Sequence, residues 1–553
     1  MLIDARTLAT DEAIQTEVCI IGSGPAGLTL AREFLDQDFK VCLLESGNLQ
    51  PDPDTQALCQ GEVVGDPFPA LDIIRRRQCG GTAHAWELPT DVHQIGVKFV
   101  PLDPIDFEQR EWIPYSGWPF DRAHLDPFYE RAQAVCKIGK YAYDAEDWAT
   151  AEAPTLPFVG DRVKSSVFQF GDSLVFTRDY RDQIIKSKNV TLYLNANVVE
   201  LETDDFAKTV TSVRVACLSG KQFRVSAKIV IMAAGGVENA RLLLLSNRVQ
   251  QAGLGNQHDV VGRFYIDHPL VRTGMFIPSD RNLFNAVNLY DWIRVNNLLV
   301  KGRIGLTDET MRSEHLLHMA SMISPRYPSY ETEAACALKR LLGVGGNRTK
   351  SQNYLRDISQ VVIGADDLAS AVFRKLFVKQ PAAIPDGWSD ISNKEKKFGH
   401  FDVFSPTEQA PDPDNRLTLS EQRDALGCRQ SKLHWRWRDI DVRSVERHQQ
   451  ILAEDIARSG LGQLKIVQEN GRPLLPGPGA HHPMGVTRMH VDPKQGVVDA
   501  DARVHSTSNL FIAGSSVFPT GGFANPTLTI VALSIRLADT VKQTIALDKM
   551  VLV

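Results

Sequence analysis

Residues 17–47 carry the pattern that most constrains the fold, a strand–turn–helix–strand unit built around the motif GSGPAG. An apolar strand, 18–21, leads into the motif, and a helical pattern, 28–35, follows it. A second apolar strand, 41–44, ends at Glu45. A dinucleotide-binding βαβ unit needs these parts in this order. The pattern therefore predicts an α/β fold, α+β overall, with a Rossmann-like domain at the N-terminus.

Each glycine of the motif has a physical role in such a unit. Gly22 makes the tight turn, Gly24 lets the backbone approach a pyrophosphate, and Gly27 allows the helix to pack close to the strand. The helix N-terminus offers free N–H groups and a partial positive charge to the phosphates. Glu45 is expected to accept hydrogen bonds from ribose hydroxyls. This segment alone does not distinguish NAD from FAD.

Two later segments have the patterns that a two-domain FAD enzyme uses to complete its cofactor site. Residues 190–204 form an expected strand that passes near an adenine, with Val198 or Val199 as the contact and Val199 preferred. Residues 228–242 form an expected strand, a Gly-Gly turn and a helix, which places Ala234 and Gly235 beside the cofactor. An ordinary strand–helix turn is the alternative for the two glycines.

The C-terminal region repeats the strand–glycine–helix pattern. A strand, 510–513, ends in Gly514 and Ser515, and a glycine-rich stretch leads to Asn525, Pro526 and Thr527 at the start of a long helical pattern. Proline suits the first turn of a helix, with Asn525 as the cap and Thr527 in the first turn. The positive end of that helix would stabilise an anionic reduced flavin. A role for Asn525 as a helix cap alone is the alternative.

A histidine pair stands in the late stretch HHPMGVTRM, residues 481–489. Histidines in a Pro/Gly loop are most often structural or exposed. A neutral imidazole is nevertheless a suitable general base near neutral pH. The stretch by itself leaves both interpretations open for His481 and His482.

Composition narrows the class of protein. A chain of 553 residues is too long for one core, so two or more domains are expected. A net charge of −6 and a pI near 6.2 speak against a nucleic-acid partner. The sequence has no apolar run of about 20 residues, so no membrane span is expected. The N-terminus lacks a secretion signal, and the eight cysteines form no C-x-x-C pair. These features predict a cytoplasmic protein without a zinc site.

The motifs together resemble those of the glucose–methanol–choline (GMC) flavoprotein oxidoreductases. They occur in the family's order and span nearly the whole chain: GSGPAG (22–27), CGGTAHAW (79–86), AAGGVENARLLL (233–244), HPMGVTRM (482–489) and GGFANPTLT (521–529). Within the family, the C-terminal stretch is most similar to pyranose oxidases and bacterial sugar or glycoside 3-oxidoreductases. The resemblance implies FAD as the cofactor.

The resemblance also assigns roles to residues. It makes His482 the catalytic base and Asn525 the second member of the catalytic pair, with His481 as a neighbour that shapes the loop. It places cofactor contacts at Gly81, Thr82 and His84. Pyranose oxidases attach flavin through a histidine just before the tryptophan of this segment, whereas Ala85 stands there in this chain. Adjacent side chains of an extended segment face opposite sides, so non-covalent FAD is expected.

A family acid is also missing near the C-terminal strand. Gly514 and Ser515 stand at that place, which predicts a cofactor contact through backbone and hydroxyl. No metal site is expected.

The motif order predicts a discontinuous domain organisation. Residues 1–100, 155–265 and 475–553 are expected to form the FAD-binding domain, and 101–154 a connecting or lid segment. Residues 266–474 are expected to form the substrate domain, with a mainly antiparallel sheet over the flavin. Strand patterns at 296–306 and 431–440 support that sheet.

The predicted activity is FAD-dependent oxidation of a secondary hydroxyl of a sugar or glycoside to a keto-sugar. His482 would remove the hydroxyl proton and flavin N5 would receive the hydride. The alternatives are oxidation of a non-sugar alcohol, such as a sterol or choline-like compound, and a non-redox lyase or decarboxylase on the same fold. The sequence leaves open the sugar, the electron acceptor (oxygen, a quinone or another compound) and a homo-oligomeric state.

Three further segments have more than one interpretation. Arg75, Arg76 and Arg77 would hold a diphosphate or an anionic substrate, or form a solvated basic cluster. Residues 337–357 are expected to form a helix, a glycine loop and a helix, with no phosphate loop. Residues 366–381 are expected to form an amphipathic helix that packs on its own domain, or else contacts a membrane or a partner.

Overall fold

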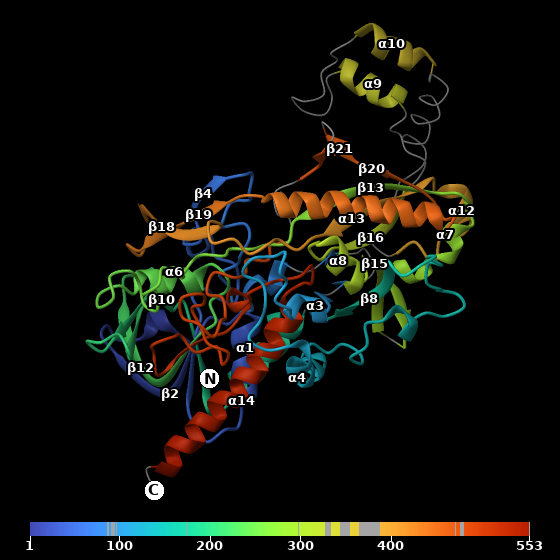
Figure 1. Ribbon diagram of the computed structural model, residues 1–553. Coiled ribbons are helices and arrows are strands. Elements are labelled where there is room, and N and C mark those ends of the chain that lie inside the picture. Colours follow the sequence, from blue (N-terminus) through green and yellow to red (C-terminus); the bar gives the residue numbers. More distant parts are fainter. Residues whose placement is uncertain are drawn as a thin grey trace.

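A computed structural model describes residues 1–85, 88–89, 94–95, 97–172, 174–296, 298–326, 333–342, 354–363, 387–469, 472–475 and 481–551. Two large sheets dominate the described part of the chain, one mainly parallel and one antiparallel (Figure 1). This arrangement confirms the predicted fold class.

Within the described residues, eight strands form the first sheet, and the expected βαβ unit lies at its centre. Across the sheet they are β1 (Leu2–Asp4), β9 (Val190–Leu194), β3 (Val41–Leu44), β2 (Ala13–Ile21), β12 (Gln222–Met232), β11 (Val210–Ala216) and β10 (Asn197–Thr203), with β23 (Leu510–Ile512) beside the C-terminal half of β12. The ladders from β1 to β12 and the β12–β23 ladder are parallel, and those joining β10, β11 and β12 are antiparallel. Residues 18–21 are continuously buried, as expected for a central parallel strand covered on both faces.

Helices from both ends of the chain cover this sheet. Helix α1 (Pro25–Glu33) follows β2 directly, and α14 (Thr527–Val551) packs against α1 and against α4 (Arg122–Val135) (Figure 1). Side chains of all three helices join the main hydrophobic core with those of the sheet. The two ends of the chain thereby pack into one core.

The second sheet is antiparallel, and α13 (Asp439–Arg458) lies along it (Figure 1). Eight strands of the described chain form it: β20 (Gly462–Ile466), β13 (Leu270–Pro278), β17 (His400–Pro406), β16 (Ala320–Arg326), β15 (Leu298–Leu306), β8 (Val163–Gly171) and β7 (Val97–Phe99), with β14 (Ile293–Val295) beside β15. The strand expected at 296–306 is β15. A second core cluster lies between this sheet and its helix.

Several strands lie in places that differ from the sequence prediction. The strand expected at 431–440 is β19 (Arg429–Trp435), which belongs to a separate small sheet with β18 (Arg416–Arg423) and β4 (Gly61–Gly65). Strands β7 and β8 fall in ranges predicted for the FAD-binding domain, yet both belong to the antiparallel sheet. The pairing partner of a strand depends on long-range register, which local pattern does not contain.

Two helices occur where a helix–loop–helix was expected. Helices α9 (Glu333–Leu342) and α10 (Tyr354–Ile363) pack against each other beyond β13 and β20 (Figure 1). The amphipathic helix expected at 366–381 lies outside the described residues. Among the described helices, none combines the length and apolar character that a membrane crossing requires.

Candidate cofactor and catalytic site

A cavity of about 1270 Å³, including the space open at its mouth, lies at the carboxyl ends of β2, β12 and β23. Its walls are the glycine turns after these strands, together with 74–77 and 481–483. Ligands of parallel α/β sheets bind at this edge.

In the first glycine turn, two glycines are required by close packing and a third faces the cavity. Gly22 has a φ of +102°, and an added Cβ would lie 2.6 Å from the carbonyl oxygen of Ala233. A Cβ on Gly27 would lie 1.9 Å from the carbonyl oxygen of Gly22. A Cβ on Gly24, in contrast, would meet no protein atom within 4 Å and would extend into the cavity wall. Gly24 thus leaves open a space that a bound group can fill.

The other two glycine turns leave the same kind of space. Gly235 follows β12 and Gly514 follows β23, with φ values of +89° and +110°. Neither position has a protein atom within 4 Å of an added Cβ, and both line the cavity with Ala234 and Ser515. The Ser515 hydroxyl donates a hydrogen bond to the carbonyl of Pro483, 2.7 Å away. The turns after three strands therefore expose backbone atoms to the same cavity.

Glu45 lies at the end of β3, where the sequence placed it, and joins two turns. Its Oε2 accepts hydrogen bonds from the Ser23 backbone N–H at 2.9 Å and from the Ser23 hydroxyl at 2.6 Å. Its Oε1 accepts from the Gly47 N–H at 2.7 Å. The residue is buried and lines the cavity. It therefore orders the glycine turn and keeps a carboxylate at the cavity wall.

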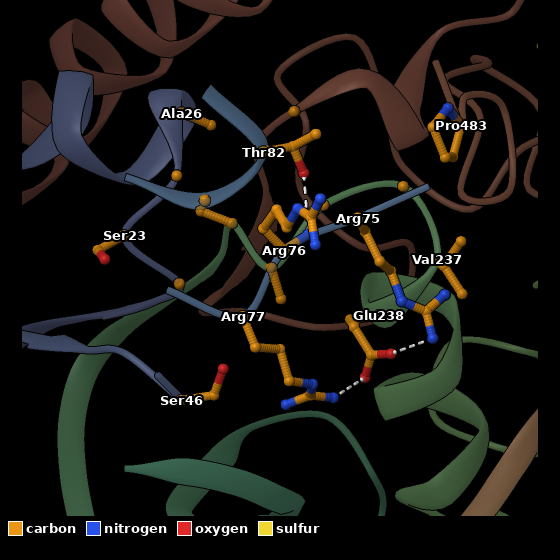
Figure 2. A pocket seen from close by; sticks show the side chains of 18 of the residues that line it. Ser23, Ala26, Ser46, Arg75, Arg76, Arg77, Thr82, Val237, Glu238 and Pro483 are labelled. Carbon is orange, nitrogen blue, oxygen red and sulfur yellow. Dashed lines mark hydrogen bonds and ion pairs between the residues drawn. The ribbon is translucent and has the colours of Figure 1, made fainter. Parts of the chain in front are cut away.

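Two of the three clustered arginines, Arg75 and Arg77, are paired and largely shielded from solvent, whereas Arg76 is exposed. Arg75 and Arg77 flank the carboxylate of Glu238 at 3.0 and 2.8 Å (Figure 2). Burial opposes the charged form of Glu238, but the guanidinium groups of Arg77, Arg241 and Arg75 lower its pKa to about 2. Nε and Nη1 of Arg75 are buried without a hydrogen-bond partner in the described protein. They are free to bind an anionic group of a ligand in this cavity.

Glu238 was missed in the sequence analysis, although its signal is visible. It follows the Gly-Gly turn in GGVENAR, at the start of α6 (Glu238–Leu245).

The remaining predicted cofactor contacts divide into two groups. Gly81 and Thr82 line the cavity, and Thr82 accepts a hydrogen bond from the Arg76 backbone N–H at 3.3 Å (Figure 2). His84 is absent from the described lining, and its Nε2 lies 2.8 Å from the carbonyl oxygen of Cys79.

Val199 also lies away from the cavity. Asn195 adopts a φ of +58°, which ends β9, and β10 begins at Asn197. Ala196 and Val198 consequently line the cofactor cavity, while Val199 contributes to a smaller neighbouring pocket. Of the two valines that the pattern offered, Val198 lies at the cavity and the preferred Val199 does not, because 190–204 is two strands and not one.

The C-terminal helix starts one residue later than expected, and this frees Asn525. The Pro526 carbonyl accepts the first helical hydrogen bond, from Ile530 at 2.8 Å, and the helix begins at Thr527. Pro526 is therefore the cap residue. Pro526 and Ile530 line the cavity, whereas Thr527 is buried behind them. The Asn525 side chain instead points to His482, with Nδ2 at 3.3 Å from Nε2.

A second histidine completes the arrangement around His482. Nδ1 of His268 lies 3.0 Å from Nδ1 of His482, and Nε2 of His268 lies 3.2 Å from the carbonyl oxygen of Gly521. Because a carbonyl only accepts, His268 carries its proton on Nε2, and its Nδ1 accepts from the Nδ1–H of His482. The Asn525 amide N–H then donates to Nε2 of His482. The lone pair of His482 is consequently on Nε2, where it accepts from Asn525.

The neighbourhood keeps His482 neutral. Desolvation, followed by the charges of His268, Lys98 and His481, lowers the pKa of His482 well below its usual value. Desolvation likewise lowers the pKa of His268 to about 4. A neutral imidazole accepts a proton, so this site suits general-base chemistry.

Asp267 fixes the backbone of both histidines. Its Oδ1 accepts from the His268 N–H at 2.7 Å and from the His482 N–H at 2.9 Å. Burial raises the pKa of Asp267 to about 6. The sequence analysis missed Asp267 and His268. The available signal was a second His-Pro pair at 268–269, matching the pair at 482–483.

Comparison with known families matches both parts of this site. Residues 17–265 match the family model described as FAD binding domain, and residues 411–534 match the model described as GMC oxidoreductase. The open glycine positions and the unpaired nitrogens of Arg75 fit FAD.

Individual relatives act on different alcohols. The large subunit of fructose dehydrogenase from Gluconobacter japonicus is 28% identical over 350 residues, which cover 63% of this chain and 53% of that protein. A 2-methyl-1,2-propanediol dehydrogenase from Mycolicibacterium austroafricanum is 22% identical over 96% of both chains. A C-glycoside 3-oxidase from Arthrobacter globiformis is 33% identical over 114 residues, only 20% of this chain and 21% of that protein. The glycoside oxidase likeness is thus partial.

A solved structure shows the same fold over nearly the whole chain. It is an FAD-dependent oxidoreductase from Chaetomium thermophilum, with a TM-score of 0.53 and 16% identity, covering 96% of this chain and 99% of that one.

Proposed function

Because this chain belongs to the GMC oxidoreductase family and is an FAD-dependent enzyme acting on CH–OH groups, we propose that it oxidises a secondary hydroxyl of a sugar or glycoside to a ketone. The observation that carries the proposal is the contact between His482 and Asn525 beside the cofactor cavity. The fructose dehydrogenase likeness supports a sugar as the substrate.

The proposed roles follow from the proton positions. His482 takes the hydroxyl proton of the substrate on Nε2, and the imidazolium that forms is held by its Nδ1–H bond to His268. The Asn525 amide holds the substrate oxygen, so that the carbon–hydrogen bond keeps one orientation. FAD, when bound, supplies the acceptor for the hydride that leaves the carbon. A positioned base contributes about 10²–10⁴-fold to such a reaction.

We also propose that FAD is held without a covalent bond. Ala85 stands where pyranose oxidases have their linking histidine, and His84 is directed at the Cys79 carbonyl. The cofactor contacts then come from the glycine turns, Glu45 and the arginine segment.

A non-sugar alcohol is the second candidate. The propanediol dehydrogenase likeness spans 96% of both chains, whereas the fructose dehydrogenase likeness spans 53% of that protein. Oxygen and a quinone are the candidate electron acceptors, and the spectral test below shows whether oxygen acts. The lyase or decarboxylase hypothesis has no comparable support.

The test is an anaerobic flavin spectrum recorded in the dark with sugars, glycosides and simple diols. A substrate should bleach the flavin absorbance, and readmitting air then tells whether oxygen restores it. The variant His482→Ala should keep bound FAD and lose about 10²–10⁴-fold in the rate of bleaching.

His258→Ala is the matched control, because His258 is exposed. It should bleach at the wild-type rate. Normal bleaching by His482→Ala would remove the base assignment, and bleaching only by diols would replace the sugar by a simple alcohol.

A further inference from the structure

One face of the antiparallel sheet holds three basic side chains from neighbouring strands. Lys98 lies on β7, and Lys301 and Arg303 lie two residues apart on β15. Between them, β8 places Phe168 opposite Lys301 and Phe170 opposite Lys98. Directly opposed residues, and residues two apart on one strand, share a face of a sheet. The three cations therefore surround the same aromatic patch.

This basic face borders the catalytic pair. The Lys98 Nζ and the Arg303 Cζ lie 4.4 and 5.6 Å from the centre of the Phe168 ring. Arg303 also lies 4.2 Å from the ring of Phe523, two residues before Asn525. The charge of Lys98 is among the causes that lower the pKa of His482 and of His268. Its ammonium group is thus within electrostatic reach of the proposed base.

The acidic side chains nearby do not balance these charges. Arg303 pairs with Asp103 at 3.6 Å. Asp103 and Asp106 also face His318, with its Nε2 3.5 Å from Asp103 and its Nδ1 2.8 Å from Asp106. Within the described part of the chain, the ammonium groups of Lys98 and Lys301 have no hydrogen bond and no ion pair. The two ammonium groups therefore contact aromatic rings and no carboxylate.

Lys301 is the more deeply buried of the two lysines. Its side chain is 6% exposed, and its Nζ lies 4.2 Å from the centre of the Trp292 ring. Asp291 is the nearby acid; its Oδ2 accepts from the backbone N–H groups of Trp388 and Ser389, and its charge favours the charged form of Lys301 without forming an ion pair with it. Desolvation lowers the pKa of Lys301, and desolvation with the charges of Lys301 and Arg303 lowers the pKa of Lys98 to about 7.

Unpaired buried charges oppose folding, and replacing them by apolar groups is often neutral or stabilising. Lys98 keeps accessible surface, so it is not sealed inside the core. Charges that cost stability beside a catalytic pair are expected where a ligand of opposite charge binds.

We propose that Lys98, Lys301 and Arg303 bind an anionic group of the substrate, a carboxylate or a phosphate ester, on the alcohol that His482 deprotonates. This inference rests on the proposed function and narrows its substrate class to acidic sugars and related hydroxy acids. Three donors on one rigid sheet would fix the anion, and thereby choose which hydroxyl reaches His482.

The experiment uses the FAD-loaded enzyme in the dark without oxygen. Glucose, gluconate and glucose 6-phosphate are compared by the concentration that half-saturates flavin bleaching. At least one anionic compound should half-saturate at a concentration at least tenfold below that of glucose. Lys301→Met should bring the ratio of the two half-saturating concentrations, glucose over the anionic compound, to near one. It should also raise the unfolding temperature of the ligand-free holoenzyme, because an unpaired buried charge is removed.

Lys432→Met is the matched control, since Lys432 lies on a strand of the small sheet and pairs with Glu62 at 3.0 Å. This variant should keep the wild-type ratio of half-saturating concentrations. Equal half-saturation by all three compounds would overturn the proposal. If Lys301→Met changes the half-saturating concentration equally for neutral and anionic compounds, the proposal is also overturned. The lysine then acts on the bound flavin.

A binding measurement separates this inference from the proposed function. Gluconate and inorganic phosphate should raise the unfolding temperature of the wild-type holoenzyme and not that of Lys301→Met. That outcome without any bleaching would sustain the anion site and reject sugar oxidation. Equal shifts in both proteins would reject the anion site.

Discussion

At the scale of single residues, His268 determines which nitrogen of His482 can act. The Gly521 carbonyl fixes the proton of His268, and His268 in turn fixes the proton of His482. The lone pair of His482 is left on Nε2, where Asn525 lies 3.3 Å away. Partners of this kind act through tautomer and orientation, and their loss slows reactions without removing the base.

Replacing His268 therefore tests a positioning role. His268→Leu should slow flavin bleaching by about tenfold or more, but by less than His482→Ala, because the base remains in the wrong tautomer. His268→Gln, whose amide oxygen can accept the Nδ1–H, should recover part of the rate. Stopped-flow bleaching at saturating substrate measures both variants. Equal rates for the leucine and glutamine variants would point to a packing role.

The pH dependence of the wild type follows from the same contacts. Since desolvation lowers the pKa of His482 below 6.5, the imidazole stays neutral as the pH falls through 6.5. The acid limb of the bleaching rate should therefore lie below pH 6.5. A midpoint at or above 6.5 would mean that another group is titrating.

At the scale of elements, the site depends on where strands end. Each cavity-forming turn follows a parallel strand, and its glycines either pack on neighbouring backbone or face the ligand space. The break at Asn195 shows how sensitive this is, because it directs Val198 and not Val199 to the cofactor cavity. The break at Asn195 and the register shift between Val198 and Glu200 together set which side chains share a face.

Two glycines of one turn should therefore fail in different ways. Gly27→Ala places a methyl 1.9 Å from the Gly22 carbonyl oxygen and should destabilise the FAD-free protein by about 1–3 kcal/mol. Gly24→Ala meets no protein atom within 4 Å and should unfold like the wild type. Its methyl group should instead weaken FAD binding, measured by flavin titration. Wild-type FAD affinity in Gly24→Ala would mean that the cofactor passes elsewhere.

At the scale of the whole molecule, a fully buried ion pair joins the connecting segment to the antiparallel sheet region. Arg110 and Glu408 have no exposed side-chain surface, and Nη1 of Arg110 donates to Glu408 at 2.9 Å. Glu408 also accepts from the His318 backbone N–H at 2.9 Å. Residues 298 positions apart are thereby held in one place.

Removing one partner of this pair should be costly. Glu408→Gln leaves the Arg110 charge buried and unpaired, so a loss of about 3–5 kcal/mol is expected. Glu421→Gln is the control, because the Glu421 side chain is 95% exposed and its pair with Arg429 should contribute less than about 1 kcal/mol. Urea denaturation of both variants measures the difference. Coinciding midpoints would contradict a structural role for the pair.

The sequence by itself determined the βαβ unit and the fold class, and its resemblance to a known family implied FAD as the cofactor and His482 as the candidate base. These depend on short-range backbone demands, such as glycines in tight turns, and on motifs contained in a few consecutive residues. Only the tertiary structure decided that His268 faces His482 across 214 positions, that Glu238 binds Arg75 and Arg77, and that Lys98 lies with Lys301. Those contacts depend on strand register and on the packing of distant segments. Local pattern contains neither, because each segment is compatible with several partners until the whole chain folds.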